Sequence, residues 1–516
     1  MKRNRRIIYF SCVTLIMLVM IIPAFLLNLS LPPLGDGAAI ALEVNTLISG
    51  GEIKYINGPM FFIYTSAVFN SITGKYLFLP TIFGLMICLA VFLLSFKLTK
   101  SLLGAILISL SALSLPYTIL YSSTFFMETS VVFFIILTLY TNFKLIEDDT
   151  TQWLILTGLF LGVSVSLKQT AYILPIIITL QNLLVSSSKK LRYKIKNSIK
   201  LIFISMIIIL PFIAQFFYLT GTIFEPNNPL LTTTPVNKFA QNYLSNEINF
   251  EQIHLGSHFS QLLPEKFLST YNPSLYYYYN FHLSKIIFLT LVVMGCVVLY
   301  RTKRREFVYL SIFLIIYHLS LVFIRVQRYM FQSKILILII LISPIVFYSH
   351  KKSRFYKYLA ISMIIVHLVL FVPLYLEGIK FAESRENTMC WNPSGEAPIY
   401  NLIEAYDWIK QNSLEEIIIA DPCRNEAVYY ADRDTYWLSP FKDPSLYIAL
   451  RNSEKNEVIK TAQNQNIKYI IIMENMLSKN GKLNTPQFLP ISTNLFIKEN
   501  FKEVFHKEGV YVYEFY

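Results

Sequence analysis

The sequence has little charge and few of the motifs that mark soluble nucleotide-using enzymes. Only 15% of its 516 residues are charged and 54% are hydrophobic, whereas soluble chains contain about 25% charged residues. Such a chain has more apolar surface than a soluble fold can bury, so most of it is predicted to lie in a membrane. It has no Gly-rich phosphate loop and no zinc-type cysteine spacing, which argues against a nucleotide-driven pump.

Cysteine is also scarce, with five residues in the chain. Cys12, Cys88 and Cys296 lie inside apolar runs, where they are expected to pack as small hydrophobic side chains. Cys390 and Cys423 lie in the polar C-terminal region. If that region is outside the cytosol, they could form one disulfide, although the sequence alone does not show that the sulfurs meet.

The basic residues form short tracts between apolar runs. The net charge of +13 could suggest nucleic acid, but this pattern is typical of cytoplasmic loops of membrane proteins, so we expect no nucleic-acid partner. The N-terminus has a basic tract, residues 2–6, followed by the apolar run 7–29. That run is longer than a signal-peptide core and has no cleavage pattern after it, which favours an uncleaved first helix with a cytoplasmic N-terminus.

Apolar runs long enough to cross about 30 Å of hydrocarbon predict about eleven transmembrane helices. They lie near residues 7–29, 77–96, 102–120, 125–143, 153–168, 170–187, 199–219, 284–300, 307–325, 333–349 and 358–376. A further apolar segment, 59–73, is too short for a full span and suits a re-entrant or interfacial position.

Loop charges support this count. Eleven spans place the main basic tracts in the cytoplasm, where basic residues accumulate, and a twelfth span at 59–73 would place them all outside. The tracts are Lys97/Lys100, Lys189–Lys196, Arg301–Arg305 and Lys351–Arg354. The loops 30–76 and 220–283, and everything after about residue 377, are then extracytoplasmic.

The C-terminal region changes character. Its β-rich runs 417–420, 469–472 and 510–513 alternate with helix-like stretches at 399–411 and 456–466, which predicts a small α/β domain. We therefore predict two parts: an α-helical polytopic membrane domain, 1–378, and an extracytoplasmic α/β domain, 379–516.

The first outer loop carries polar residues at an unusual place. Asp36 follows the first span, and Glu43 and Asn57 precede the short segment that starts at Pro59. This arrangement places a carboxylate at the membrane surface beside irregular backbone, which is tolerated at membrane depth only where protein buries it or where it lines a cavity.

From about residue 30 to 185 the chain resembles the multi-spanning glycosyltransferases of the C-type (GT-C) fold. These enzymes use polyprenyl-phosphate sugars and include protein O-mannosyltransferases and lipid A aminoarabinose transferases. Asp36 matches the first acid of their pattern, Gly58-Pro59 resembles their Pro-Pro element, and Glu128 is similar to their second acid. Gly37 stands where the family usually has Glu, so the resemblance implies a divergent member in which Glu43 could substitute.

The resemblance implies an inverting transferase. In such an enzyme a carboxylate takes the proton of the attacking hydroxyl, and cations stabilise the departing lipid phosphate. Asp36 suits the base, and Glu128 suits acceptor binding or a divalent cation held with Asp36; some relatives carry a metal here and others do not. The cations Lys168, Arg325 and Arg328 lie at outer ends of spans, against the charge rule. Arg328-Tyr329 also resembles an Arg-Tyr element of these enzymes.

The implied partners are a polyprenyl-phosphate-linked sugar donor, a lipid, glycan or protein acceptor, and membrane lipids. Frequent Ile, Lys and Asn hint at an AT-rich bacterial genome, and hence a plasma (inner) membrane and a role in the cell envelope. Other readings remain open: Asp36 could be a solvated loop acid or helix cap, and the arginines could extend to lipid headgroups.

Two other functions remain open. A transporter or flippase would place its ionisable residues in mid-membrane, whereas here they lie at the ends of spans. A polymerase or ligase of another multi-spanning class typically relies on a large outer loop rich in Arg and His. The loop 220–283 has His254 and His258 but no Arg, and a two-histidine pair without an acidic partner is a weak metal signal.

Overall fold

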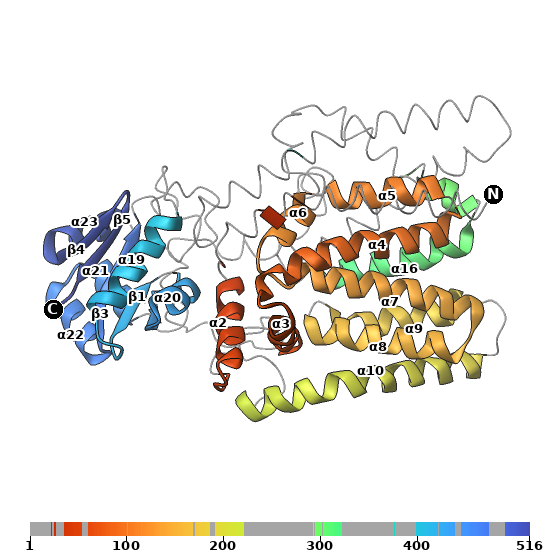
Figure 1. The fold of residues 1–516 in the computed structure, drawn as a ribbon, viewed down its shortest axis with the longest axis horizontal. Helices are drawn as coiled ribbons and strands as arrows, with labels where there is room; N and C mark the ends of the chain where they lie inside the picture. Colours follow the sequence, from red (N-terminus) through yellow and green to blue (C-terminus); the bar gives the residue numbers. More distant parts are fainter. Residues whose placement is uncertain are drawn as a thin grey trace. The chain divides into compact units, whose positions relative to one another are not determined.

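The computed structural model divides into two compact units, each described separately (Figure 1). The helical unit contains residues 1–30, 59–225 and 251–382, and the α/β unit contains residues 31–58, 226–250 and 383–516. The structure describes residues 22, 25–26, 33, 36–53, 60–100, 102–114, 116–168, 171–185, 191–220, 293, 295–301, 303–321, 376, 399–421, 423–438, 445–473 and 491–516.

The described part of the helical unit consists of helices that pack along one another. They are α3 (Met60–Thr73), α4 (Leu79–Thr99), α5 (Leu102–Ser114), α6 (Pro116–Ser123), α7 (Glu128–Asp148), α8 (Thr151–Leu167), α9 (Leu174–Val185), α10 (Leu191–Thr220) and α16 (Arg304–Leu321), with a 3₁₀ turn η1 at Tyr76–Phe78. Figure 1 shows α4, α7, α8 and α10 running side by side.

Three helical segments of the described residues are long and apolar enough to cross a membrane, namely Tyr76–Thr99, Glu128–Asp148 and Leu191–Gln215. They coincide with predicted spans, as do the shorter apolar helices α8 and α9. The predicted span 102–120 is wrong as a single helix, because α5 ends at Ser114 and α6 begins at Pro116. Proline lacks the N–H that a helix interior needs and is favoured at a first helical position. The total of eleven spans stays a prediction.

The short apolar segment predicted at 59–73 forms α3, a helix of 14 residues. At 1.5 Å of rise per residue it is about 21 Å long, which is less than the roughly 30 Å of a hydrocarbon core. A phenyl ring of α3 also packs edge-on against α10, with Phe61 and Phe212 ring centroids 5.4 Å apart.

Two glycines allow α8 to approach α10 closely. A methyl group added at Gly162 would lie 2.7 Å from the backbone oxygen of Ser205, and one added at Gly158 would lie 2.7 Å from Cβ of Ile204. Their spacing of four residues puts both on one helix face. This small-residue pattern is the one that lets helices in membranes pack backbone to backbone.

Gly162→Ala is expected to push α8 away from α10, because backbone atoms cannot move aside as a flexible side chain can. The expected cost is about 1–3 kcal/mol, the usual penalty for overpacking. The thermal midpoint of the detergent-purified chain measures this cost, with Ile155→Val on the exposed side of α8 as the control. Equal midpoints for Gly162→Ala and the unmodified chain would contradict the close packing.

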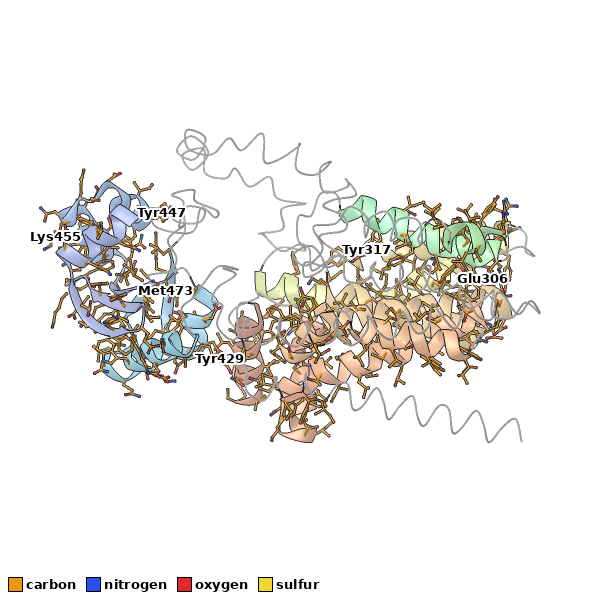
Figure 2. The ribbon with its side chains drawn as sticks, turned by 90° about the horizontal axis from the view of Figure 1, so that it is seen from above. Glu306, Tyr317, Tyr429, Tyr447, Lys455 and Met473 are labelled. Atoms are coloured by element: carbon orange, nitrogen blue, oxygen red, sulfur yellow. The ribbon has the colours of Figure 1, made fainter. Side chains whose placement is uncertain are left out.

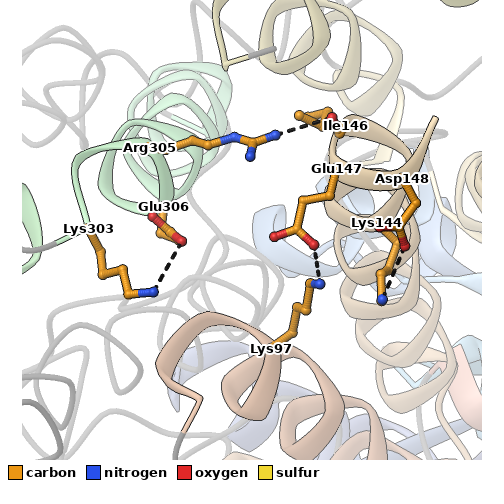
Figure 3. Close-up of polar contacts among 8 residues, drawn as sticks. All are labelled: Lys97, Lys144, Ile146, Glu147, Asp148, Lys303, Arg305 and Glu306. Carbon is orange, nitrogen blue, oxygen red and sulfur yellow. Dashed lines mark hydrogen bonds and ion pairs between the residues drawn. The ribbon is translucent and has the colours of Figure 1, made fainter. Parts of the chain in front are cut away.

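Charged side chains gather where α4 and α7 end and α16 begins (Figure 3). Lys97 pairs with Glu147, Lys144 Nζ lies 3.2 Å from Asp148 Oδ2, and Arg305 Nη2 donates to the carbonyl oxygen of Ile146 at 3.2 Å. The basic tracts at Lys97 and at Arg301–Arg305 therefore lie at the same end of the helical unit, as the predicted topology requires. That this end faces the cytoplasm stays a prediction.

The α/β unit has a five-stranded sheet in the order β2-β1-β3-β5-β4. The strands are β1 (Ile418–Asp421), β2 (Asp434–Trp437), β3 (Ile467–Met473), β4 (Lys502–Lys507) and β5 (Val510–Glu514). β1, β2 and β3 are parallel, and β5 is antiparallel to β3 and β4. The Glu508-Gly509 turn has positive φ at both residues, as a tight hairpin turn between twisted strands requires.

Helices cover both faces of this sheet, giving three layers. Side chains of α19 (Ile399–Asn412) and α20 (Arg424–Ala431) form one core with Tyr469 and Ile471 of β3. Side chains of α21 (Ser445–Asn452), α22 (Lys455–Asn464) and α23 (Ile491–Asn500) form the other core with Ile470 and Ile472. Figure 2 shows the side chains that fill this unit, with Met473 at the end of β3. The predicted C-terminal α/β domain is confirmed.

The α/β unit also contains α2 (Asp36–Ile48), which packs against α20. The compact unit therefore differs from the predicted division at 378/379, which assigned the whole first outer loop to the membrane domain. Cys423 is disulfide-bonded, while Cys390, its predicted partner, lies outside the described residues.

Asp421, the last residue of β1, has a carboxyl group that is fully buried. The pKa of this group is raised from 3.8 to about 7, chiefly by burial and also by the nearby Glu426, while hydrogen bonds from the Cys423 N–H and the Tyr406 hydroxyl lower it. Because the folded pKa is above the unfolded one, this carboxyl binds more protons in the folded than in the unfolded chain between these values. The contribution of Asp421 to stability is therefore largest at low pH and falls as pH rises towards 7.

Asp421→Asn should remove this pH dependence, because an amide can still accept from the Cys423 N–H and donate to Tyr406. From pH 5 to pH 8 the unmodified chain should lose roughly 2–3 kcal/mol relative to the variant. Hydrogen exchange of the β1 amides in the full-length chain, corrected for intrinsic rates, measures the difference. Parallel pH profiles for the two chains would contradict it.

Candidate active site

Glu128 and Lys168 are brought together by the hairpin of α7 and α8. Glu128 is the first residue of α7, and Lys168 directly follows α8. α7 ends at the left-handed residue Asp149, and the hydroxyl of Thr150 caps α8 by accepting from the Trp153 N–H. Two antiparallel helices of similar length return the chain to its starting end, so residues 40 apart in sequence meet.

The two side chains form a buried ion pair. The Nζ atom of Lys168 lies 2.6 Å from Oε1 of Glu128, and the side chains are only 8% and 2% exposed. A buried pair of this kind offsets the desolvation of both charges only while both are present. Glu128 also lies at the N-terminus of α7, where the helix dipole favours a negative charge. The predicted acid and the predicted cation therefore form one pair.

Hydroxyl groups follow Glu128 on α7. Thr129 and Ser130 are fully buried, and their oxygens have no hydrogen-bond partner among the described residues. Buried hydroxyl groups normally have a partner, and leaving one without costs about 1–3 kcal/mol. The first turn of α7 thus combines an ion pair with two hydroxyl groups that can hydrogen-bond to a ligand. Thr129 and Ser130 were not predicted as site residues, although their position beside Glu128 in the sequence could have suggested them.

This end of α7 lies opposite the charged end of Figure 3, because α7 runs from Glu128 to Asp148. Its surroundings are built by α4 and α6. The hydroxyl of Thr81 on α4 donates to the carbonyl oxygen of Ser122 on α6 at 2.6 Å. The aromatic rings of Tyr76 and Phe125 pack edge to face, with centroids 5.1 Å apart. The Glu128–Lys168 pair therefore lies at a well-packed end of the helices.

Asp36, the predicted base, is the first residue of α2 in the α/β unit. Glu43 lies about two turns further along the same helix and is buried. Asp36 and Glu43 therefore belong to the α/β unit, whereas Glu128 and Lys168 belong to the helical unit. Asn57, Pro59, Arg325, Arg328 and Tyr329, together with His254 and His258, lie outside the described residues.

The sequence also suggested that Glu128 and Asp36 could hold a divalent cation. Within the described residues, no group of three or more His, Cys, Asp or Glu side chains could hold a metal ion. Glu128, one of the two acids suggested for a divalent cation, contacts the ammonium group of Lys168, and the divalent cation stays a prediction.

The model of the family dolichyl-phosphate-mannose-protein mannosyltransferase matches residues 57–217, which include the whole α7–α8 hairpin. Together with the structural likenesses below, this match confirms the resemblance to glycosyltransferases of the GT-C fold, as a divergent relative. No curated protein sequence matches the chain significantly.

Two solved structures illustrate the likeness. ArnT from Cupriavidus metallidurans in the apo state is 10% identical, with a TM-score of 0.59 over 100% of this chain and 99% of that chain. The archaeal oligosaccharyltransferase AglB from Archaeoglobus fulgidus, in complex with an inhibitory peptide and a dolichol-phosphate, is 14% identical, with a TM-score of 0.58 over 89% of this chain and 69% of that chain. ArnT bound to undecaprenyl phosphate matches with a TM-score of 0.56 at 11% identity, over 99% of this chain and 98% of that chain. At these identities the likeness establishes the fold.

Proposed function

We propose that this chain is an inverting glycosyltransferase that moves a sugar from a polyprenyl-phosphate donor to a hydroxyl group of a lipid, glycan or protein. The observation that carries the proposal is the buried Glu128–Lys168 pair at the start of α7, inside the region that matches the mannosyltransferase family model. A buried charged pair beside hydroxyl groups that lack partners is costly for stability alone and is typical of a site that binds a ligand.

The solved relatives support the choice of donor. One ArnT structure contains undecaprenyl phosphate and one AglB structure contains a dolichol-phosphate. Both are lipid phosphates, so two solved proteins of similar fold bind such a carrier. We extend that carrier class to this chain.

The chemistry assigns a task to each side chain. The acceptor oxygen attacks the anomeric carbon from the face opposite the phosphate, and the bond between that carbon and the phosphate oxygen breaks, which inverts the configuration. Asp36 accepts the acceptor's proton. The lipid phosphate leaves with the bonding electrons, and Lys168, with Arg325 and Arg328, stabilises its charge.

Glu128 has a separate task in this scheme. It holds the Lys168 ammonium group at the end of α8 and, with Thr129 and Ser130, offers hydrogen-bonding groups to the substrates. Glu43, Asn57 and Pro59 shape the first outer loop, and Tyr329 supports Arg328. In line with the predicted topology, we propose that these residues lie on the extracytoplasmic face of a bacterial inner membrane.

A donor comparison in membranes tests the proposal. Membranes that contain the chain, and matched membranes without it, are supplied with radiolabelled polyprenyl-phosphate sugars or with labelled nucleotide sugars. We expect label to reach an acceptor only from the polyprenyl-phosphate donors and only when the chain is present. Transfer from none of the lipid donors, or direct transfer from a nucleotide sugar, would overturn the proposal.

A further inference from the structure

The helix that begins with Asp36 packs on the C-terminal domain within one compact unit. α2 lies against α20, and the first turns of α2 bury small side chains, Ala38, Ala39 and Ala41. Small side chains let two helices approach closely, as in membrane helix pairs. Residues far apart in the sequence thereby form one structural unit.

A hydrogen bond fixes the backbone just before α2. The hydroxyl of Tyr430 on α20 donates to the carbonyl oxygen of Pro33 at 2.9 Å, across 397 residues of sequence. Pro33 is buried and lies three residues before Asp36. The fixed φ of proline leaves this peptide little freedom, so the bond sets where the chain enters α2.

The Tyr430 ring is held in place by further contacts within the α/β unit. Its ring stacks on that of Tyr406, with centroids 6.2 Å apart and an interplanar angle of 4°. Tyr406 is fully buried, and its hydroxyl donates to Oδ2 of Asp421 at 2.9 Å. Oδ1 of Asp421 accepts from the Cys423 N–H at 2.5 Å. A continuous set of contacts therefore runs from the end of β1 through the two tyrosines to Pro33.

Tyr429, the neighbour of Tyr430, lies on the same helix, as Figure 2 shows. Its ring packs edge-on against Tyr430, with centroids 4.7 Å apart. Tyr429 thus shares the helix and the aromatic packing with Tyr430, while the Tyr430 hydroxyl makes the bond to Pro33. This difference allows the hydroxyl bond to be separated from ring packing.

We propose that Tyr430 is a positioning residue for the transfer reaction, which fixes the Pro33 backbone and thereby the place of Asp36. The inference rests on the proposed function. It gives the C-terminal α/β domain a part in the chemistry, because the domain holds the loop that carries the base. A displacement of about 1 Å in a catalytic group can lower a rate by about 100-fold, so loss of one hydrogen bond at this point should be measurable.

The test compares Tyr430→Phe with Tyr429→Phe in the full-length purified chain. Tyr430→Phe keeps the ring stack on Tyr406 and removes the hydroxyl that donates to Pro33. We expect kcat to fall about 5–20-fold with the donor KM within about twofold, since a base that is poorly placed affects the chemical step more than binding. Tyr429→Phe should retain the kcat of the unmodified chain.

Hydrogen exchange supplies a readout that does not depend on activity. Amides at the start of α2 should exchange about 3–10-fold faster in Tyr430→Phe than in Tyr429→Phe. Unchanged exchange in α2, or an unchanged kcat in an active chain, would overturn this inference alone. An unmodified chain with no transfer activity would overturn the proposed function and this inference with it.

Discussion

Replacement of Asp36 by Asn is expected to lower the rate of sugar transfer by about 10²–10⁴-fold, the usual contribution of a positioned general base. Asparagine has nearly the same shape but cannot accept the proton of the acceptor hydroxyl. The donor KM should change much less than kcat, because in the proposed mechanism the lipid phosphate binds to cations and not to this carboxylate. Initial rates with a labelled polyprenyl-phosphate sugar measure both constants.

Glu52→Gln is the matched control for this prediction. Glu52 is an exposed acid of the same outer loop, and its replacement by Gln removes one carboxylate without removing the proposed base. Its activity should equal that of the unmodified chain. An active Asp36→Asn variant would show that Asp36 is a helix-capping or solvated acid and would remove it from the mechanism.

Breaking the Glu128–Lys168 pair is expected to have the second large effect. Lys168→Met leaves the Glu128 carboxylate buried without this cation, and Glu128→Gln leaves the ammonium group without this carboxylate. Each single change should cost about 3–5 kcal/mol, as for other buried pairs that lose one partner. Thermal midpoints and transfer rates of the purified variants measure the loss of stability and of activity.

The double variant separates structure from function. Glu128→Gln combined with Lys168→Met removes both charges and should recover most of the lost stability, while transfer stays low because the phosphate loses the Lys168 ammonium group. Recovery of transfer in the double variant would show that the pair is structural. Lys144→Met with Asp148→Asn removes a more exposed pair at the other end of α7 and should change stability by less than about 1 kcal/mol.

The interior of the α/β domain could be predicted from the sequence, but its edges could not. The three predicted strands are β1, β3 and β5, which lie next to each other inside the sheet and are rich in buried apolar residues. The missed strands β2 and β4 form the two edges. β4, with the sequence KEVFHK, carries charges that edge strands use to avoid pairing with other chains, and these weaken a hydrophobic pattern.

In the helical unit, hydropathy predicted where most described helices lie but not where they break. Hydropathy measures only how apolar a run is, so the run 102–120 looked continuous. Pro116 starts a new helix because proline lacks the backbone N–H that a helix interior needs. Pro116 within the apolar run was therefore the sequence signal that could have predicted this break.

The sequence predicted residues of the candidate site but not the contacts between them. Glu128 was selected as an acid and Lys168 as a cation at an unusual place, and the structure shows that they pair. The contact between Tyr430 and Pro33 joins residues 397 apart. No local pattern encodes such a contact, since it depends on how α2 packs against α20.

In the proposed reaction, the chain cleaves the bond between the sugar and the lipid phosphate. The direct measurement follows both products when purified chain in lipid vesicles acts on a doubly labelled polyprenyl-phosphate sugar in the presence of acceptor. We predict equal amounts of glycosylated acceptor and free polyprenyl phosphate, with inverted configuration at the anomeric carbon. Movement of the intact lipid-linked sugar across the bilayer without release of polyprenyl phosphate would contradict the account and indicate a flippase.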